Sequence, residues 1–171
     1  CSSGKSARLD WLLHCRGELA ASMAMAKAEE SLGKENGYQH LEQVMSVDSV
    51  QDQKFSNKQD DGRILRVFMA GDGEERVFAG QGIGYSLKER IPFILRRRKA
   101  SNAIFAAVYD LTGTGSAVTG ISLEALPTAE SRGKTALRIM GKDSATLLRM
   151  DFSDRREGSE QTRLQIEPPL P

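Results

Sequence analysis

The sequence contains few of the residues on which several common protein classes depend. Its 171 residues include only two cysteines, Cys1 and Cys15, and two cysteines cannot form the disulfide framework of a small secreted domain. One bridge between them is possible, and the alternative is a buried Cys15 with an incidental Cys1. Aromatic residues make up 6% of the chain. No row of them alternates with basic residues, as a protein that binds single-stranded nucleic acid would require.

The chain also lacks an excess of charge and any long apolar run. It has 24 lysines and arginines against 23 aspartates and glutamates, a net charge of +1, so it has no overall field that attracts nucleic acid or an anionic membrane. No apolar run approaches the roughly 20 residues of a membrane span. With 39% hydrophobic residues, the composition excludes wholesale disorder. We therefore expect a folded chain with no membrane span and no nucleic-acid partner.

Motifs of catalysis and metal binding are scarce. Gly80, Gly82 and Gly84 have G-x-G-x-G spacing. This differs from the G-x-G-x-x-G fingerprint of dinucleotide-binding loops, so we expect an irregular bend between strands instead. No G-x-S-x-G motif is present, and the two histidines, His14 and His40, do not stand in a spacing typical of zinc ligands. The residues alone therefore predict a binding or accessory domain with no catalytic residue.

The sequence does contain many short apolar runs separated by turn signals. Residues 8–16 alternate with period two, which places Asp10 and His14 on the same face of a strand. The polar stretch 52–62 is expected to be a surface loop, and residues 18–32 an extended segment that runs into a polar loop. Further strands are predicted at 43–50, 64–69, 76–79, 92–98, 103–109, 118–126, 135–140, 146–152 and 162–166.

Turn signals between these runs predict three antiparallel hairpins. The hairpins join 64–69 to 76–79 across an Asp-Gly pair, 92–98 to 103–109, and 135–140 to 146–152. Short strands with turns at near-regular spacing, without alternating helices, indicate an all-β fold. We predict an antiparallel two-sheet β-sandwich, with one domain over residues 1–166 and a Pro-rich tail at 167–171.

The densest basic cluster comprises Arg96, Arg97, Arg98 and Lys99. On a strand, Arg96 and Arg98 share one face and Arg97 points the other way. Such a run is commonly a solvated strand edge that discourages aggregation. The functional alternative is a surface that binds an acidic partner, because arginine forks match carboxylate and sulfate groups. We therefore take Arg96, Arg97 and Arg98 as candidate substrate-binding residues.

Two stretches resemble landmarks of the β-sandwich in heparinase II/III-like polysaccharide lyases. The first comprises a small Gly-containing turn at 2–5, Arg8, a D-[WY]-x-x-H strand at Asp10–His14, and Gly17–Leu19. The second is the basic strand Arg90–Arg98 followed by the apolar strand Phe105–Tyr109. The order and spacing of the two landmarks are similar to those of the family, and together they cover residues 2–110.

This resemblance implies that the chain is the C-terminal β-sandwich portion of a larger bacterial lyase, secreted or periplasmic. Such enzymes cleave uronate-containing acidic polysaccharides by β-elimination. Most of their catalytic groups lie in an N-terminal α/α toroid domain, which this sequence does not contain. We therefore expect the chain, which does not begin with Met, to be part of a longer protein and to be inactive alone. Its expected partners are an acidic polysaccharide and its own toroid domain.

The resemblance also bears on zinc. Some members of the family hold zinc in the sandwich through two histidines and an aspartate. His14 lies on a strand that could supply one ligand, with its partners outside this chain, and we expect the chain itself to require no cofactor. The structural alternative is a histidine whose ring donates to a backbone carbonyl next to Trp11.

Two other functions stay open. The chain could be a free-standing, non-catalytic β-sandwich that binds acidic glycans through the arginine run. It could also be a module that stabilises a neighbouring domain, which predicts a large apolar patch on its surface.

Overall fold

The fold was analysed in a computed structural model, which describes residues 2–86, 88–114, 117–124, 134–152 and 163–170. The regular structure of the described residues is nearly all β: strands account for 63%, and a single 3-10 turn is the one helical element among these residues. The elements are β1 (Ser2–His14), β2 (Glu18–Ala21), β3 (Ala26–Lys27), the 3-10 turn η1 (Tyr38–His40), β4 (Glu42–Ser49), β5 (Gln53–Lys58), β6 (Ile64–Met69), β7 (Glu75–Ile83), β8 (Arg90–Asn102), β9 (Ala107–Gly113), β10 (Gly120–Glu124), β11 (Lys134–Met140), β12 (Ala145–Asp151) and β13 (Arg163–Leu170).

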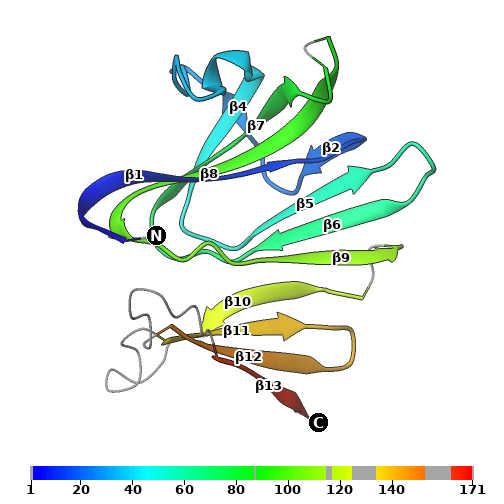
Figure 1. The fold of residues 1–171 in the computed structure, drawn as a ribbon. Helices are drawn as coiled ribbons and strands as arrows, with labels where there is room; N and C mark the ends of the chain where they lie inside the picture. The colour runs from blue at the N-terminus through cyan, green and yellow to red at the C-terminus, as the bar shows by residue number, and fades with distance from the viewer. Residues whose placement is uncertain (1, 87, 115–116, 125–133, 153–162, 171) are drawn as a thin grey trace.

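The strands form three antiparallel sheets. Sheet A has the order β1-β8-β7-β4-β3, sheet B the order β2-β5-β6-β9, and sheet C the order β10-β11-β12-β13. The three sheets lie one above another, with sheet B between the other two (Figure 1). The prediction of an all-β antiparallel sandwich is confirmed, and sheet C is a third layer beyond the two predicted sheets.

Strand β6 shows why sheet B can be the middle layer. Val67 and Met69 belong to a buried cluster shared with β7 and β8 of sheet A. Phe68 and Ala70 belong to a second buried cluster, shared with β10 and β11 of sheet C. Because side chains alternate along a strand, the unbroken apolar run at this end of β6 supplies both clusters.

A third cluster lies on the face of sheet A that points away from sheet B. There Leu32 packs with Phe78, Phe93 and Leu95, and all four side chains are buried. Leu32 belongs to the segment between β3 and β4, so this segment covers part of the outer face of sheet A. The rest of that face carries charged side chains, which are described below.

The predicted loop at 52–62 contains a strand instead. In β5 the alternate residues Gln53, Phe55 and Asn57 are buried, and only one of the three is apolar. The Gln53 side-chain amide donates to the backbone oxygen of Gln51 at 2.8 Å. A strand that buries amides has too weak an apolar alternation to be recognised from hydrophobic periodicity.

Two of the three predicted hairpins are wrong, and the third is confirmed. The strands β6 and β7 lie in different sheets, and so do β8 and β9, so residues 70–74 and 103–106 cross between layers. Strands β11 and β12 do pair as a hairpin from Lys134↔Asp151 to Met140↔Ala145. The Asp-Gly signal therefore marked a turn correctly, but it could not tell a hairpin from a crossover.

The C-terminal residues 167–170, which we expected to form a tail, belong to β13 instead. Glu167 and Leu170 pair with Leu147 and Ala145 of β12. Residue 171 lies outside the described residues. The expected extended character of residues 18–32 is confirmed in part by β2 and β3.

Candidate functional site

The arginine run lies in β8, which is an inner strand of sheet A between β1 and β7. It is therefore not an edge strand. The side chains of Arg96 and Arg98 are only 1% and 3% exposed, which corrects the expectation that the run lies on a surface. Arg97 points to the opposite face, as the strand periodicity predicts. Substrate binding by these residues stays a prediction. Of the three, only Arg97 lies on the outer face of the sheet, where its side chain is 14% exposed and paired with Asp10.

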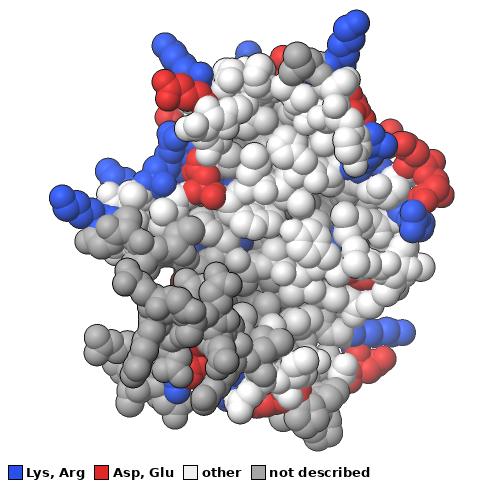
Figure 2. Space-filling view, in the orientation of Figure 1, with Lys and Arg blue, Asp and Glu red and all other residues white. Residues whose placement is uncertain are grey.

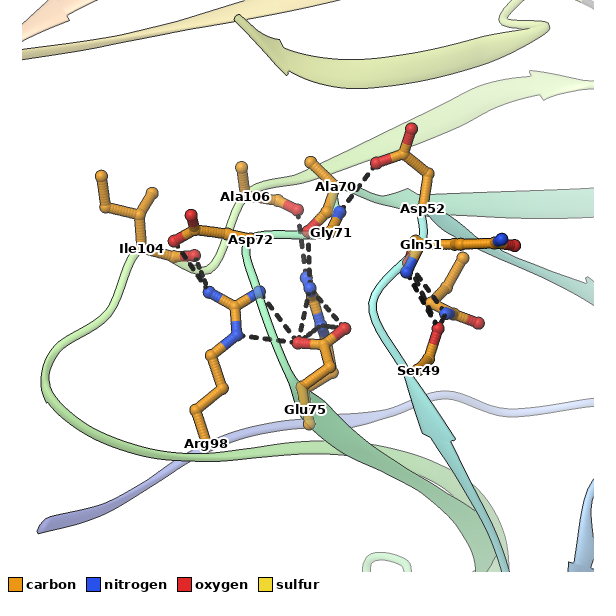
Figure 3. Close-up of polar contacts among 12 residues, drawn as sticks. Ser49, Gln51, Asp52, Ala70, Gly71, Asp72, Glu75, Arg98, Ile104 and Ala106 are labelled. Atoms are coloured by element: carbon orange, nitrogen blue, oxygen red, sulfur yellow. Dashed lines mark hydrogen bonds and ion pairs between the residues drawn. The ribbon is translucent and has the colours of Figure 1, made fainter. Parts of the chain in front are cut away.

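The Glu75 carboxylate holds both buried arginines. Arg96 donates to it from Nε and Nη2 at 2.7–3.1 Å, and Arg98 donates to Oε2 from Nε at 2.9 Å. The guanidinium groups also donate to the backbone oxygens of Ala70 at 2.5 Å and Ile104 at 2.7 Å. Figure 3 shows Glu75 and Arg98 beside these two segments. Since the segments are the crossovers between sheets A and B, the buried network has a structural role.

Burial lowers the pKa of Arg96, although the adjacent Glu75 carboxylate opposes that shift. Arginine nevertheless stays protonated in proteins. Both buried groups are therefore cations that depend on Glu75 for neutralisation.

On the outer face of sheet A, Arg97 binds Asp10 of β1 through two bonds. Its Nε donates to Oδ1 at 2.9 Å and its Nη2 donates to Oδ2 at 2.8 Å. The Tyr38 hydroxyl donates to the same Oδ2 at 2.5 Å, and Arg97 also donates to the backbone oxygen of Leu32 at 3.1 Å. Asp10, Arg97 and Tyr38 thus attach the segment between β3 and β4 to the sheet.

This network makes the stability of the chain depend on pH. Burial alone would raise the pKa of Asp10, but the hydrogen bonds from Arg97 and Tyr38 outweigh burial and lower it. A carboxylate with a lowered pKa in the folded state stabilises the fold above its unfolded pKa of about 3.9, and this stabilisation disappears as the pH falls through the folded pKa.

We expect Asp10→Asn to lower the free energy of unfolding by about 2 kcal/mol at pH 7. Urea titrations at pH 7 and at pH 3 should show that the difference from the wild type shrinks at pH 3; a constant difference would contradict the assignment.

An open pocket of about 540 Å³ lies beside Arg97, and we call it the outer-face pocket. Its basic lining residues are Arg76, Arg97 and Lys99, and its other lining residues are Asp48, Ser49, Val50, Glu74 and Glu75. Asp10, Arg97, Arg76 and Asp48 stand in register across β1, β8, β7 and β4, so each of the two central arginines has an acidic neighbour. Lys99 is exposed and has no ion-pair partner among the residues that the structure describes.

Charged side chains of both signs lie at the margin of the visible face, and the centre of that face carries few charges (Figure 2). Figure 2 shows lysines and arginines next to aspartates and glutamates along the margin of the face in view, with no continuous basic area. This distribution agrees with the net charge of +1. It favours a local contact with an acidic ligand over an extended electrostatic surface.

His14 lies at the end of β1 and is exposed. Its ring lies against Gly82 of β7, where a Cβ atom would be 2.5 Å from the ring Cε1, and 6.3 Å from the ring of Phe93. Gly80 and Gly82 lie in the strand β7, where Gly82 leaves room for the His14 ring, so the predicted irregular bend is wrong for these two glycines. Gly84 lies after the end of β7, in the β7–β8 turn. Partial burial lowers the pKa of His14.

The described residues do not provide a metal site at His14. They contain no group of three His, Cys, Asp or Glu side chains that could hold a metal ion. Asp10, which the strand periodicity places on the same face as His14, lies about 13 Å away along β1 and is bound to Arg97 and Tyr38. Zinc binding by His14 with ligands from outside this chain stays a prediction.

A second pocket was not predicted from the sequence, and we call it the rim pocket. It measures about 500 Å³ and lies where the ends of β1, β6 and β9 meet. Its polar lining residues are His14, Cys15, Arg16, Gln59 and Arg63, and Leu13, Ile64, Leu65, Leu111 and Gly113 complete it. Burial raises the pKa of the Cys15 thiol to about 11, so this cysteine is unreactive at neutral pH. Tyr85 and Glu89 of the β7–β8 turn contact Arg16 at the edge of this pocket.

The described part of the chain contains no helix that is long and apolar enough to cross a membrane. Comparison with known proteins adds no further assignment: no family model matches the chain, and no curated protein matches its sequence.

Proposed function

We propose that this chain is the C-terminal β-sandwich portion of a heparinase II/III-like polysaccharide lyase, and that it binds the uronate-containing polysaccharide at the outer-face pocket. The observation that carries the proposal is the convergence of Arg76, Arg97 and Lys99 on one open pocket. Arginine forks and a lysine ammonium suit carboxylate and sulfate groups. The D-[WY]-x-x-H strand of the first landmark and the basic strand of the second also lie side by side, because β1 pairs with β8 from Ala7↔Ala100 to His14↔Phe93.

Under this proposal the catalytic groups lie in the toroid domain, which this sequence does not contain. β-Elimination at a uronate needs a group that neutralises the carboxylate, a base that removes the C5 proton, and an acid for the leaving oxygen. In this chain Lys99 supplies the neutralising charge, because Asp10 already neutralises Arg97, and the base and the acid belong to the toroid. The proposal places the whole protein in the periplasm or outside the cell, where the polysaccharide is found.

The isolated chain should therefore show no lyase activity. Incubation with heparin, heparan sulfate or alginate should leave the ultraviolet absorbance of unsaturated uronate at the level of a protein-free control. Release of the unsaturated product by the pure chain, abolished by His14→Ala, would show that the catalytic groups lie in this chain and would contradict the proposed division.

Binding at the outer-face pocket should depend on Lys99. A unit charge 4 Å from another contributes about 1 kcal/mol in water. Lys99→Glu turns that attraction into a repulsion of the same size, a change of about 2 kcal/mol, and should weaken binding about thirtyfold. Affinity chromatography on immobilised heparin and on immobilised alginate would measure the change as earlier elution in a salt gradient. Lys142→Glu, an equal charge change in the turn between β11 and β12, should elute later than Lys99→Glu.

The same column separates glycan binding from the stabilisation of a neighbouring domain. A free-standing glycan-binding module and a lyase portion should both elute earlier after Lys99→Glu. These two differ in the length of the native gene product, which has several hundred residues for a lyase and only this sandwich for a free-standing module. If the wild-type chain passes through both columns at low salt, glycan binding by the chain is wrong, and stabilisation of a neighbouring domain becomes the better function.

A further inference from the structure

The β7–β8 turn carries the most exposed aromatic side chain in the described part of the molecule. Tyr85 is 89% exposed. The guanidinium carbon of Arg16 lies 4.6 Å from the centroid of its ring, in a cation–π contact. With so much of the residue exposed, the ring face opposite Arg16 is open to solvent. Tyrosine combines a flat apolar ring with a polar hydroxyl, which suits a ligand that has both an apolar face and polar edges.

Glu89 holds Tyr85 and Arg16 together. Its Oε1 accepts from Nη2 of Arg16 at 2.9 Å, and its Oε2 accepts from the backbone N–H of Tyr85 at 2.6 Å. The backbone N–H of Gly84 donates to the Glu89 backbone oxygen at 3.1 Å. Glu89 thus holds the backbone of Tyr85 in the turn, and the cation–π contact with Arg16 holds its ring.

Arg16 connects this tyrosine to the rim pocket, because the same guanidinium side chain lines the pocket and stacks on the ring. A volume of about 500 Å³ lies within the usual range for small-ligand sites. The Gln59 amide lines the pocket, but it already donates to the backbone oxygen of Arg16 and to Oδ1 of Asn57. Arg63 offers guanidinium donors on one side, and Leu65 and Leu111 form an apolar part. A pyranose ring presents C–H faces and a polar periphery, so it matches an aromatic ring beside such donors.

The ion pair of Arg16 with Glu89 is the feature that points to an acidic sugar. The side chains of Arg16 and Glu89 are 56% and 31% exposed, and ion pairs at such exposure contribute little to stability. The Glu89 carboxylate accepts from Arg16 in the way that a carboxylate of a ligand would accept. A ligand anion could therefore exchange with it without disturbing the fold.

We propose that the rim is a second saccharide contact, separate from the outer-face pocket, in which Tyr85 stacks on an acidic pyranose and Glu89 competes with the sugar's anionic group for Arg16. The inference rests on the proposed function, because it requires that the chain meets an acidic polysaccharide. Glu89 acts here as an internal counter-ion. Without ligand, its carboxylate holds Arg16 in position, and when the sugar binds, the anionic group of the sugar replaces the Glu89 carboxylate at Arg16.

The test uses the full chain and an alginate tetrasaccharide as the probe, with binding followed by isothermal titration calorimetry. Tyr85→Ala removes the stacking surface and should weaken binding about fivefold, since aromatic contacts of this kind correspond to about a three- to tenfold change. Tyr85→Phe keeps the ring and should bind like the wild type. Glu89→Gln removes the competing charge and should tighten binding about threefold, whereas Glu35→Gln, an exposed change on the segment between β3 and β4, should leave binding unchanged.

The outcomes separate this inference from the proposed function. If Lys99→Glu weakens binding while Tyr85→Ala and Glu89→Gln leave it at the wild-type value, the rim contact is wrong and the outer-face pocket stands. If Tyr85→Ala and Glu89→Gln shift binding in the expected opposite directions while Lys99→Glu has no effect, the rim is the saccharide site and the outer-face pocket is wrong. If the wild type binds neither the tetrasaccharide nor the heparin column, both are overturned. Circular dichroism spectra that match the wild type would show that each variant is folded.

Discussion

Replacing Glu75 with leucine should lower the free energy of unfolding by about 3–5 kcal/mol, the range observed when one partner of a buried ion pair is removed. The carboxylate of Glu75 is fully buried and accepts hydrogen bonds from both Arg96 and Arg98. Without it, Arg96 becomes an interior cation whose remaining acceptors are backbone oxygens. For a chain of this length the loss corresponds to a fall of about 10 °C in Tm.

Thermal unfolding and urea titration, both followed by circular dichroism, would measure this loss. Glu74→Leu is the matched control, because the neighbouring side chain is exposed, and it should change stability by no more than about 0.5 kcal/mol. The triple change Glu75→Leu, Arg96→Met and Arg98→Met should be more stable than Glu75→Leu alone, because it leaves no buried charge without a counter-ion. A Glu75→Leu variant with wild-type stability would mean that the buried network does not hold the crossovers.

Gly17→Ala should produce the second large loss, of about 3 kcal/mol. Gly17 lies in the turn between β1 and β2, where its φ of +102° belongs to a region that L-residues rarely adopt. A Cβ atom there would lie 2.2 Å from the backbone oxygen of Lys58 and 2.9 Å from Oδ1 of Asn57. The substitution therefore adds overpacking against β5 to the backbone strain, and each of these contributes about 1–3 kcal/mol.

Gly37→Ala separates the two causes. Gly37 also has a positive φ, +88°, but a Cβ atom there would meet nothing within 4 Å. Alanine at this position should therefore show the backbone strain alone, about 1–2 kcal/mol. Equal values of Tm for the two variants would show that the contact with Lys58 yields without loss, and that the turn is less tightly packed than the structure indicates.

The strands that the sequence predicted well are those with a plain apolar alternation or run. Strand β6 at 64–69 and the β11–β12 hairpin belong to this group. Strand β5 does not, because it buries the amide side chains of Gln53 and Asn57. The layer to which a strand belongs could not be predicted either, since the turn between β6 and β7 has the same local chemistry whether the chain folds back or crosses to the next sheet.

The arginine run illustrates the same limit for the candidate site. The alternation of Arg96 and Arg98 against Arg97 follows from strand geometry alone. Which face is buried does not follow, because each face of β8 carries both apolar and basic residues: Phe93 and Leu95 share a face with Arg97, and Ile94 shares one with Arg96 and Arg98. Only the position of Glu75 on the neighbouring strand decides that the pair of arginines lies inside.

The Tyr85 contact was missed for a different reason. Arg16 and Glu89 are 73 residues apart in the chain, and neither stands in a motif. No local pattern brings two turns of different strands together, so a single sequence contains no signal for such a contact.

The pairing of β1 with β8 has a consequence for how the protein forms. The Asp10–Arg97 pair joins residues 87 positions apart, and contacts between residues so distant in the chain slow folding because a long loop must close first. During synthesis β1 emerges about 80 residues before β8, its only strand neighbour in the described sheet. At typical elongation rates of about 5–20 residues per second, the first strand therefore waits several seconds for its partner. Throughout that interval Trp11 and Leu13, which finally pack between sheets A and B, are available to other chains or to chaperones.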